Sequence, residues 1–127
     1  MAYGKFATAI NCMDGRVQEP VISWFKIRHG YDFVDMITEP GPIKSLADNV
    51  PDIVESIKAR TAISVGKHGS DIIAVIGHHD CAGNPESKVV QLAQIDYSIE
   101  QVKSWGFNVR VIGLWINDSW SVEVVRE

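Results

Sequence analysis

The sequence lacks long hydrophobic runs, basic runs and all but two cysteines, and each shortage excludes a class of protein. Nothing approaches the 18 consecutive apolar residues of a membrane-spanning helix, so we expect no membrane span. The net charge is −4 and no basic run occurs, so we expect no nucleic-acid partner. Residues 1–5 lead into the first apolar run without a secretory pattern, which favours the cytoplasm.

The two cysteines, Cys12 and Cys81, limit the chemistry further. In a reducing cytosol, two cysteines indicate metal binding or catalysis more than a structural disulfide. The alternative is two buried thiols that pack as small hydrophobic groups. The 127 residues are 46% hydrophobic and 22% charged, which is typical of one soluble globular domain over residues 1–127.

Strand and helix patterns alternate along the chain. Strands are expected at 6–11, 33–37, 71–77, 109–116 and 119–125, and helices at 17–28, 50–65 and from 85 toward 105. The strand at 71–77 is apolar on both faces, as a central parallel strand should be. The order predicts an α/β fold with a mostly parallel sheet of about five strands in the order 2-1-3-4-5. Helices should cover both faces, and the last strand should be antiparallel because only a short turn precedes it.

Reactive side chains stand at the ends of two of these strands. Cys12 follows the first strand, and His78 and Cys81 follow the third. Ligands bind outside the carboxyl ends of strands in open α/β sheets, so neighbouring first and third strands would bring the three residues together. Two thiolates and one imidazole form a typical catalytic zinc set with a fourth position left for water. We therefore predict Zn²⁺ held by Cys12, His78 and Cys81.

The other three histidines have simpler interpretations. His79 competes with His78 as a ligand, but the two-residue gap to Cys81 favours His78. His79 would then be a turn residue that faces solvent or a subunit contact. His29 and His68 stand at expected helix ends, where we predict that they act only as caps.

Asp14 and Arg16 lie two residues apart, directly after the first cysteine. One interpretation is loop order at a helix start, where aspartate is favoured. The other is a catalytic ion pair beside the metal. Arg16 would hold the carboxylate away from zinc, and Asp14 would accept a hydrogen bond from the zinc-bound water. A freed Asp14 would instead take the fourth ligand position and block the reaction.

The charge of the ligand set bears on pH dependence. Zn²⁺ with two thiolates and one neutral imidazole has no net charge, and such a site acidifies its water less than a three-histidine site. The Asp14–Arg16 pair also sums to zero. We therefore expect activity to rise with pH above neutrality.

At these residues the sequence resembles the β-class carbonic anhydrases. That family has Cys-x-Asp-x-Arg after its first strand and Gly-His-x-x-Cys after its third, and the same patterns stand here at residues 12–16 and 77–81. The resemblance implies zinc on Cys12, His78 and Cys81, an Asp14–Arg16 dyad, and hydration of CO₂ to bicarbonate by zinc-bound hydroxide. It also implies a small-molecule substrate and a homodimer or higher homo-oligomer.

Two segments depart from the family pattern. Residues 37–42 read Ile-Thr-Glu-Pro-Gly-Pro where the family has Arg-Asn-Ala-Gly, a stretch that helps to shape the substrate pocket. The chain also enters its first strand almost at once, where the family has helices that wrap a partner subunit. The alternative function is therefore a zinc-binding relative with little CO₂ activity, which acts on CS₂ or COS or has a regulatory or interaction role.

Other cysteine chemistry fits less well. A phosphatase loop needs arginine six positions after its cysteine, where this chain has Gln18 or Ser87. A rhodanese loop needs arginine five positions after, where Cys12 is followed by Val17. A structural zinc site would need a fourth protein ligand, a role that His79 or Asp14 could fill.

Overall fold

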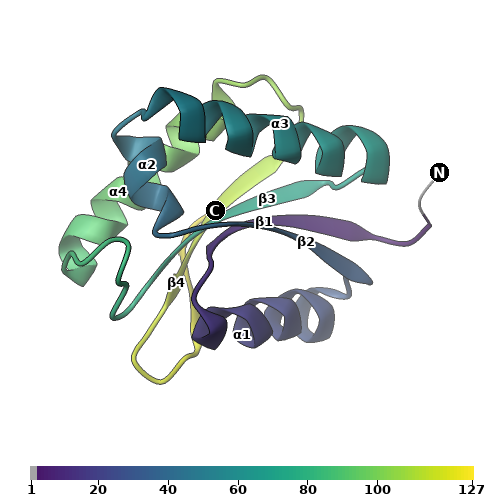
Figure 1. The fold of residues 1–127 in the computed structure, drawn as a ribbon. Helices are drawn as coiled ribbons and strands as arrows, with labels where there is room; N and C mark the ends of the chain where they lie inside the picture. Colours follow the sequence, from purple (N-terminus) through teal and green to yellow (C-terminus); the bar gives the residue numbers. More distant parts are fainter. Residues whose placement is uncertain (1–2) are drawn as a thin grey trace.

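A five-stranded sheet forms the centre of the computed structural model, which describes residues 3–127. Its strands are β1 (Phe6–Cys12), β2 (Phe33–Glu39), β3 (Ile72–His78), β4 (Arg110–Ile116) and β5 (Val122–Arg126). They lie in the order β2-β1-β3-β4-β5, and only the β4–β5 pair is antiparallel. The predicted fold class, strand order and strand direction are confirmed (Figure 1).

Helices cover both faces of the sheet, as predicted. One face carries a 3₁₀ turn η1 (Gly15–Val17), α1 (Gln18–Ser23) and a π-helical turn η2 (Trp24–Arg28). The other carries α2 (Pro42–Ala47), α3 (Pro51–His68) and α4 (Lys88–Lys103) (Figure 1). The predicted helix at 17–28 is therefore three joined helical segments of different winding. It stops before Gly30, whose φ of 68° only glycine adopts at low cost.

The sequence analysis missed α2. No helix was expected between residues 37 and 50, because Pro-Gly-Pro typically interrupts both a strand and a helix. The structure uses the same residues to start a helix: Gly41 turns the chain at a φ of 55° and Pro42 occupies the first helical turn. Proline is tolerated there because that N–H would have no helical partner in any case.

Two hydrophobic cores lie on opposite faces of the sheet. The first packs Val17, Val21 and Phe25 against β1, β3 and β4. The second packs α2, α3 and α4 against the other face, with Ile43, Ile57 and Ile95 among its members. All seven residues of β3 are buried, because both faces of this central strand are covered.

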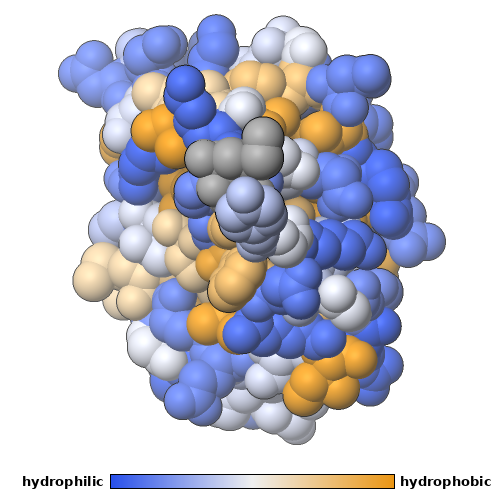
Figure 2. Space-filling view, turned by 90° about the vertical axis from the view of Figure 1, so that its right-hand side faces the viewer, coloured by the Kyte–Doolittle hydropathy of each residue, from blue (hydrophilic) through white to orange (hydrophobic). Residues whose placement is uncertain are grey.

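The surface is mostly hydrophilic on the side where the chain begins. In Figure 2 the hydrophobic residues on this side lie in small separate patches. Among residues 3–127, no helix combines the length and apolar character needed to cross a bilayer. The reactive residues lie at the other ends of β1 and β3, where both strands finish.

Candidate metal centre

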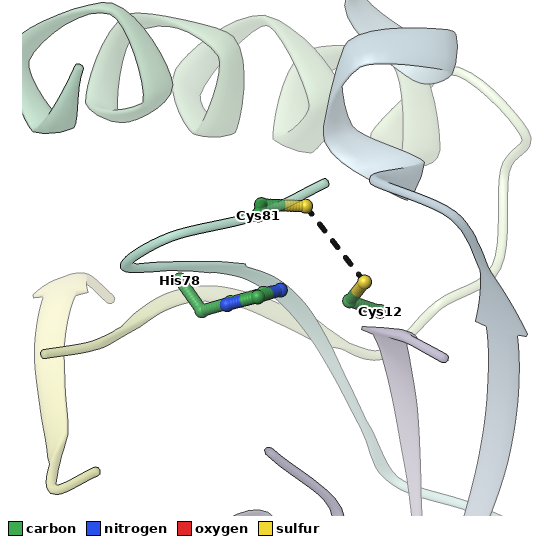
Figure 3. Close-up of side chains that lie close together, drawn as sticks. All are labelled: Cys12, His78 and Cys81. Carbon is green, nitrogen blue, oxygen red and sulfur yellow. Dashed lines mark hydrogen bonds between the residues drawn. The ribbon is translucent and has the colours of Figure 1, made fainter. Parts of the chain in front are cut away.

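Cys12, His78 and Cys81 converge at the carboxyl ends of β1 and β3. Cys12 is the last residue of β1 and His78 the last of β3, and the two strands are neighbours. Cys81 follows after a turn in which Asp80 has a φ of 58°. The ligand atoms of the three residues lie within 4.8 Å of one another. Figure 3 shows the imidazole and both sulfurs directed into the same space.

Hydrogen bonding gives His78 the tautomer of a metal ligand. Its Nδ1 lies 2.7 Å from the carbonyl oxygen of His79. A carbonyl only accepts, so Nδ1 carries a proton, and in the neutral ring Nε2 presents a lone pair. Nε2 is buried without a hydrogen-bond partner among residues 3–127. A histidine bound to a metal typically has this arrangement, with one nitrogen tied to a carbonyl and the other free for the ion.

Gln91 of α4 fixes the backbone from which His78 projects. Its side-chain oxygen accepts from the His78 N–H at 3.2 Å, and its Nε2 donates to the His78 carbonyl at 3.0 Å. Gly77 makes this close approach possible. A Cβ at that position would lie 3.0 Å from the Gln91 oxygen and 2.8 Å from Ile43. The end of β3 is thus held at the position where its imidazole meets the two sulfurs.

The distances suit a tetrahedral metal. Two zinc–sulfur bonds of about 2.3 Å at the tetrahedral angle place the sulfurs about 3.8 Å apart. The Sγ atoms of Cys12 and Cys81 are 3.8 Å apart. Both thiols are free and buried, with 4% and 5% of their surface exposed. Donor type, spacing and the unpartnered Nε2 therefore fit a soft divalent ion such as Zn²⁺.

The two thiols share a proton unequally in the metal-free site. The Cys81 thiol donates to Cys12 and lowers the pKa of Cys12 to about 4, against the opposing effect of burial. The same hydrogen bond raises the pKa of Cys81. Burial lowers the pKa of His78, but the adjacent Cys12 sulfur and the His79 carbonyl outweigh it, so the net pKa is raised. The site carries one negative sulfur before a metal displaces the remaining protons.

The predicted ion pair between Asp14 and Arg16 is present. The guanidinium Nη2 donates to Asp14 Oδ2 at 2.7 Å and Nε donates to Oδ1 at 3.0 Å. Asp14 also caps η1, because Oδ1 accepts from the Arg16 backbone N–H at 2.9 Å. Asp14 therefore both caps η1 and pairs with Arg16, and its catalytic role stays a prediction. These hydrogen bonds from Arg16 lower the pKa of Asp14 to about 2 and raise that of Arg16.

Arg16 has two further partners that the sequence analysis missed. Its Nη1 donates to Asp80 Oδ2 at 3.2 Å, and its Nη2 donates to the Asp80 carbonyl at 3.0 Å. The Trp120 ring lies against the guanidinium, with Cζ 4.4 Å from the ring centroid. For Asp80, the acidic side chain was the only signal of such a role in the sequence. No local sequence pattern indicated that Trp120 would contact Arg16.

Comparison with known proteins decides the family. The family model described as "Putative carbonic anhydrase" matches residues 2–126. The chain belongs to the carbonic anhydrase family. Among curated proteins, none matches it by sequence.

Solved structures of the β-class share the fold of this carbonic anhydrase relative. The β-carbonic anhydrase isoform I of Trichomonas vaginalis matches with a TM-score of 0.58 and 17% identity, over 95% of this chain and 82% of that one. The carbonic anhydrase of Streptococcus mutans matches at 0.56 and 15%, over 94% and 81%. A metal-free carbon disulfide hydrolase matches at 0.53 and 13%, over 97% and 79%. At these identities the likeness concerns the fold, and it shows that the chain has the fold of the β-carbonic anhydrases.

The segment that departs from the family lies against the cluster. Gly41 and Gly83 bring two backbones together: a Cβ on Gly83 would lie 2.6 Å from the Pro40 carbonyl carbon. A Cβ on Gly41 would lie 2.9 Å from the backbone of Gly83. The Gly41 N–H is among the groups that lower the pKa of Cys12. In this carbonic anhydrase relative, residues 39–42 thus contribute backbone to the site where the family has Arg-Asn-Ala-Gly.

A cavity of about 360 Å³ opens beside Cys81. It lies between the turn that follows β3, the start of α4 and the end of β4. Its lining is His79, Asp80, Cys81, Pro85, Glu86, Ser87, Lys88 and Trp115. Of the three cluster residues, Cys81 alone is part of this lining.

The remaining histidines lie outside the cluster. His79 is exposed and its ring centroid is 6.3 Å from that of Trp120. His29 ends η2 and stacks on Trp24 at 4.2 Å. His68 ends α3, but it does more than cap the helix. Its Nδ1 lies 2.6 Å from Asp35 Oδ2, so the prediction that it acts only as a cap was wrong.

Proposed function

We propose that the protein binds one Zn²⁺ through Cys12, His78 and Cys81 and hydrates CO₂ to bicarbonate. The observation that carries the proposal is the unpartnered Nε2 of His78, buried beside two sulfurs at tetrahedral spacing. Burying a polar atom without a partner costs free energy, which a bound ion would recover. The carbonic anhydrase family assignment supports this reaction.

The proposed roles follow from charge and hydrogen bonding. Zinc, when bound, acidifies water and so supplies a nucleophile near neutral pH. Cys12 and Cys81 as thiolates neutralise the ion. Asp14 accepts a hydrogen bond from the reacting water and thereby orients it, while Arg16 holds the carboxylate through two donors. The cavity beside Cys81 is the space through which we propose that CO₂ approaches.

Metal analysis and stopped-flow kinetics test the proposal. Purified protein should hold one zinc per chain, and Cys12→Ser should lose it. The zinc-loaded protein should hydrate CO₂, with a rate that rises between pH 7 and 9 because the neutral ligand set acidifies water weakly. Full zinc occupancy in Cys12→Ser would refute the ligand set. Stoichiometric zinc without a rate above buffer would refute the reaction.

A related small substrate is the second candidate. The match to carbon disulfide hydrolase concerns the fold, and residues 39–42 alter the backbone beside Cys12. CS₂ and COS are linear molecules like CO₂, so the same ligands would serve. Sulfide release from CS₂ or COS by the zinc-loaded protein, faster than hydration of CO₂, would establish this function instead.

The proposal extends to the assembly. We infer one domain over residues 1–127, present in the cytoplasm as a homodimer or higher homo-oligomer. The single sheet with a core on each face supports one domain. Exposed Val89 and Tyr97 on α4, at 78% and 69%, support a subunit contact. Sedimentation at micromolar concentration that shows only a monomer would contradict the oligomer.

A further inference from the structure

We propose that Trp120 and Asp80 are positioning residues that hold Arg16, and through it keep the Asp14 carboxylate away from the open ligand position. This inference rests on the proposed function, because it concerns the same centre. The observation behind it is that the Arg16 side chain contacts residues in three separate loops. Asp14 follows β1, Asp80 lies in the turn after β3, and Trp120 lies in the β4–β5 hairpin.

The ion pair alone is too exposed to hold its geometry. The side chain of Arg16 is 45% exposed and that of Asp14 is 20% exposed. Ion pairs in such positions contribute little by themselves, since water competes for both partners and the long arginine side chain loses entropy. Additional contacts must therefore fix Arg16 if Asp14 is to stay in one orientation.

Asp80 and Trp120 supply those contacts on the sides that Asp14 leaves free. Asp14 takes Nε and one hydrogen of Nη2. The backbone carbonyl of Asp80 accepts from Nη2, and its carboxylate, on a side chain that is 71% exposed, adds a weaker contact to Nη1. The Trp120 ring lies at 4.4 Å from Cζ, where the guanidinium attracts the ring's electron-rich face. The Arg16 guanidinium is thus contacted at its edge by Asp14 and Asp80 and on its face by the Trp120 ring.

The β4–β5 hairpin holds the backbone of Trp120 in a left-handed conformation that this residue type rarely adopts by itself. Trp120 has a φ of 58°, which is unusual for a bulky residue. Asn117 imposes it: its carbonyl accepts from the Trp120 N–H at 3.0 Å, and its side chain accepts from the N–H groups of Ser119 and Ser121. Strained residues that their surroundings hold in place are concentrated at functional sites. Here the strain directs an indole onto Arg16.

The expected consequence is a coupling between the hairpin and the metal centre. Loss of Trp120 or of the Asp80 carboxylate frees Arg16 to leave Asp14. The released carboxylate then competes for the ligand position that water and substrate require. An external anion that binds the metal at that position measures the competition directly, without an activity assay.

The test is azide binding to the cobalt-loaded protein, followed by visible absorption. Trp120→Leu should weaken azide binding about tenfold, within the range typical of coupled sites. Asp80→Asn should weaken it less, because the exposed carboxylate contact is lost while the Asp80 carbonyl still accepts from Arg16. Adding Asp14→Asn to Trp120→Leu should restore the affinity. Trp120→Phe keeps an aromatic face and should stay near the wild type. Trp105→Leu, in the core on the opposite face, and Asp118→Asn, exposed in the same hairpin, are the matched controls.

Each outcome decides a different point. Wild-type azide affinity in both Trp120→Leu and Asp80→Asn would overturn the positioning role and leave the metal centre intact. If Trp120→Leu fails to fold, Asp80→Asn still decides, because Asp80 is exposed and belongs to neither core. A wild-type chain that takes up no cobalt would overturn the proposed metal centre and this inference with it.

Discussion

Two polar clusters lie toward opposite ends of β1, and they differ in whether their hydrogen bonding is complete. The metal-ligand cluster is Cys12, His78 and Cys81, at the carboxyl ends of β1 and β3. The hydroxyl–carboxylate cluster is Thr8, Asp35, Ser64, His68 and Ser70. It lies toward the amino ends of β1 and β2, where Thr8 and Asp35 are paired.

Every member of the hydroxyl–carboxylate cluster has a hydrogen-bond partner within the chain. Thr8 contacts the hydroxyls of both Ser64, at 2.6 Å, and Ser70, at 2.8 Å. Asp35 accepts from Ser64 at 2.7 Å. The metal-ligand cluster instead leaves His78 Nε2 unpartnered, one of only two such buried side-chain atoms in residues 3–127. A satisfied cluster stabilises a fold by itself, whereas an unsatisfied one with convergent donors indicates a missing ligand.

The largest expected difference between the clusters is their response to zinc. Zinc at about 1,000 times its Kd should stabilise the wild type by about 4 kcal/mol, because it binds only the folded chain. His78→Gln should abolish this gain. His68→Gln should retain it, because that histidine belongs to the satisfied cluster. Urea unfolding with zinc or with a chelator measures the effect, and an equal gain in both variants would remove the distinction.

The second difference concerns the carboxylates of the two regions. Asp14→Asn should lower the rate of CO₂ hydration about 100-fold with zinc content unchanged, the lower end of what a positioned proton acceptor contributes. Asp35→Asn should leave the rate of the folded protein unchanged. Stopped-flow rates at equal zinc loading compare them. A similar loss of rate in Asp35→Asn would show that the two regions act together.

Stability without metal should depend more on the satisfied cluster. Thr8→Val keeps the side-chain shape but leaves the buried hydroxyls of Ser64 and Ser70 short of a partner. We expect a loss of about 2 kcal/mol in the free energy of unfolding. Zinc content should not change. Chelator-treated wild type and variant, compared by urea unfolding, test this, and equal midpoints would contradict it.

The smallest expected effect is the pH dependence of the Asp14–Arg16 pair. The pKa of Asp14 falls from 3.8 to about 2 on folding, so ionised Asp14 stabilises the protein above pH 4. That contribution is lost as the pH falls through 2, and solvent screening keeps it below about 1 kcal/mol. Asp14→Asn keeps the cap on η1 and removes only the charge. The stability difference between wild type and variant should be constant above pH 4 and shrink toward pH 2.

Sequence patterns predicted elements with strong local signals and missed those that depend on distant contacts. The apolar run of β3 was sufficient to predict a central strand. The positions of Cys12, His78 and Cys81 were sufficient to predict that they meet, because neighbouring parallel strands end at the same edge of the sheet. Helix α2 was missed because Pro42 reads as a break until its place in the first helical turn is known. The Asp35–His68 pair was missed because 33 residues separate its members.

The sequence by itself determined the strand order and the three candidate ligands, since hydrophobic periodicity and local spacing are properties of short segments. Only the tertiary structure decided which nitrogen of His78 is free and which residues hold Arg16. Those contacts join loops after β1, β3 and β4. The physical reason is that hydrogen bonds and ring contacts act over a few ångströms in space. Residues far apart in the sequence can be that close, and the number of residues between them does not predict it.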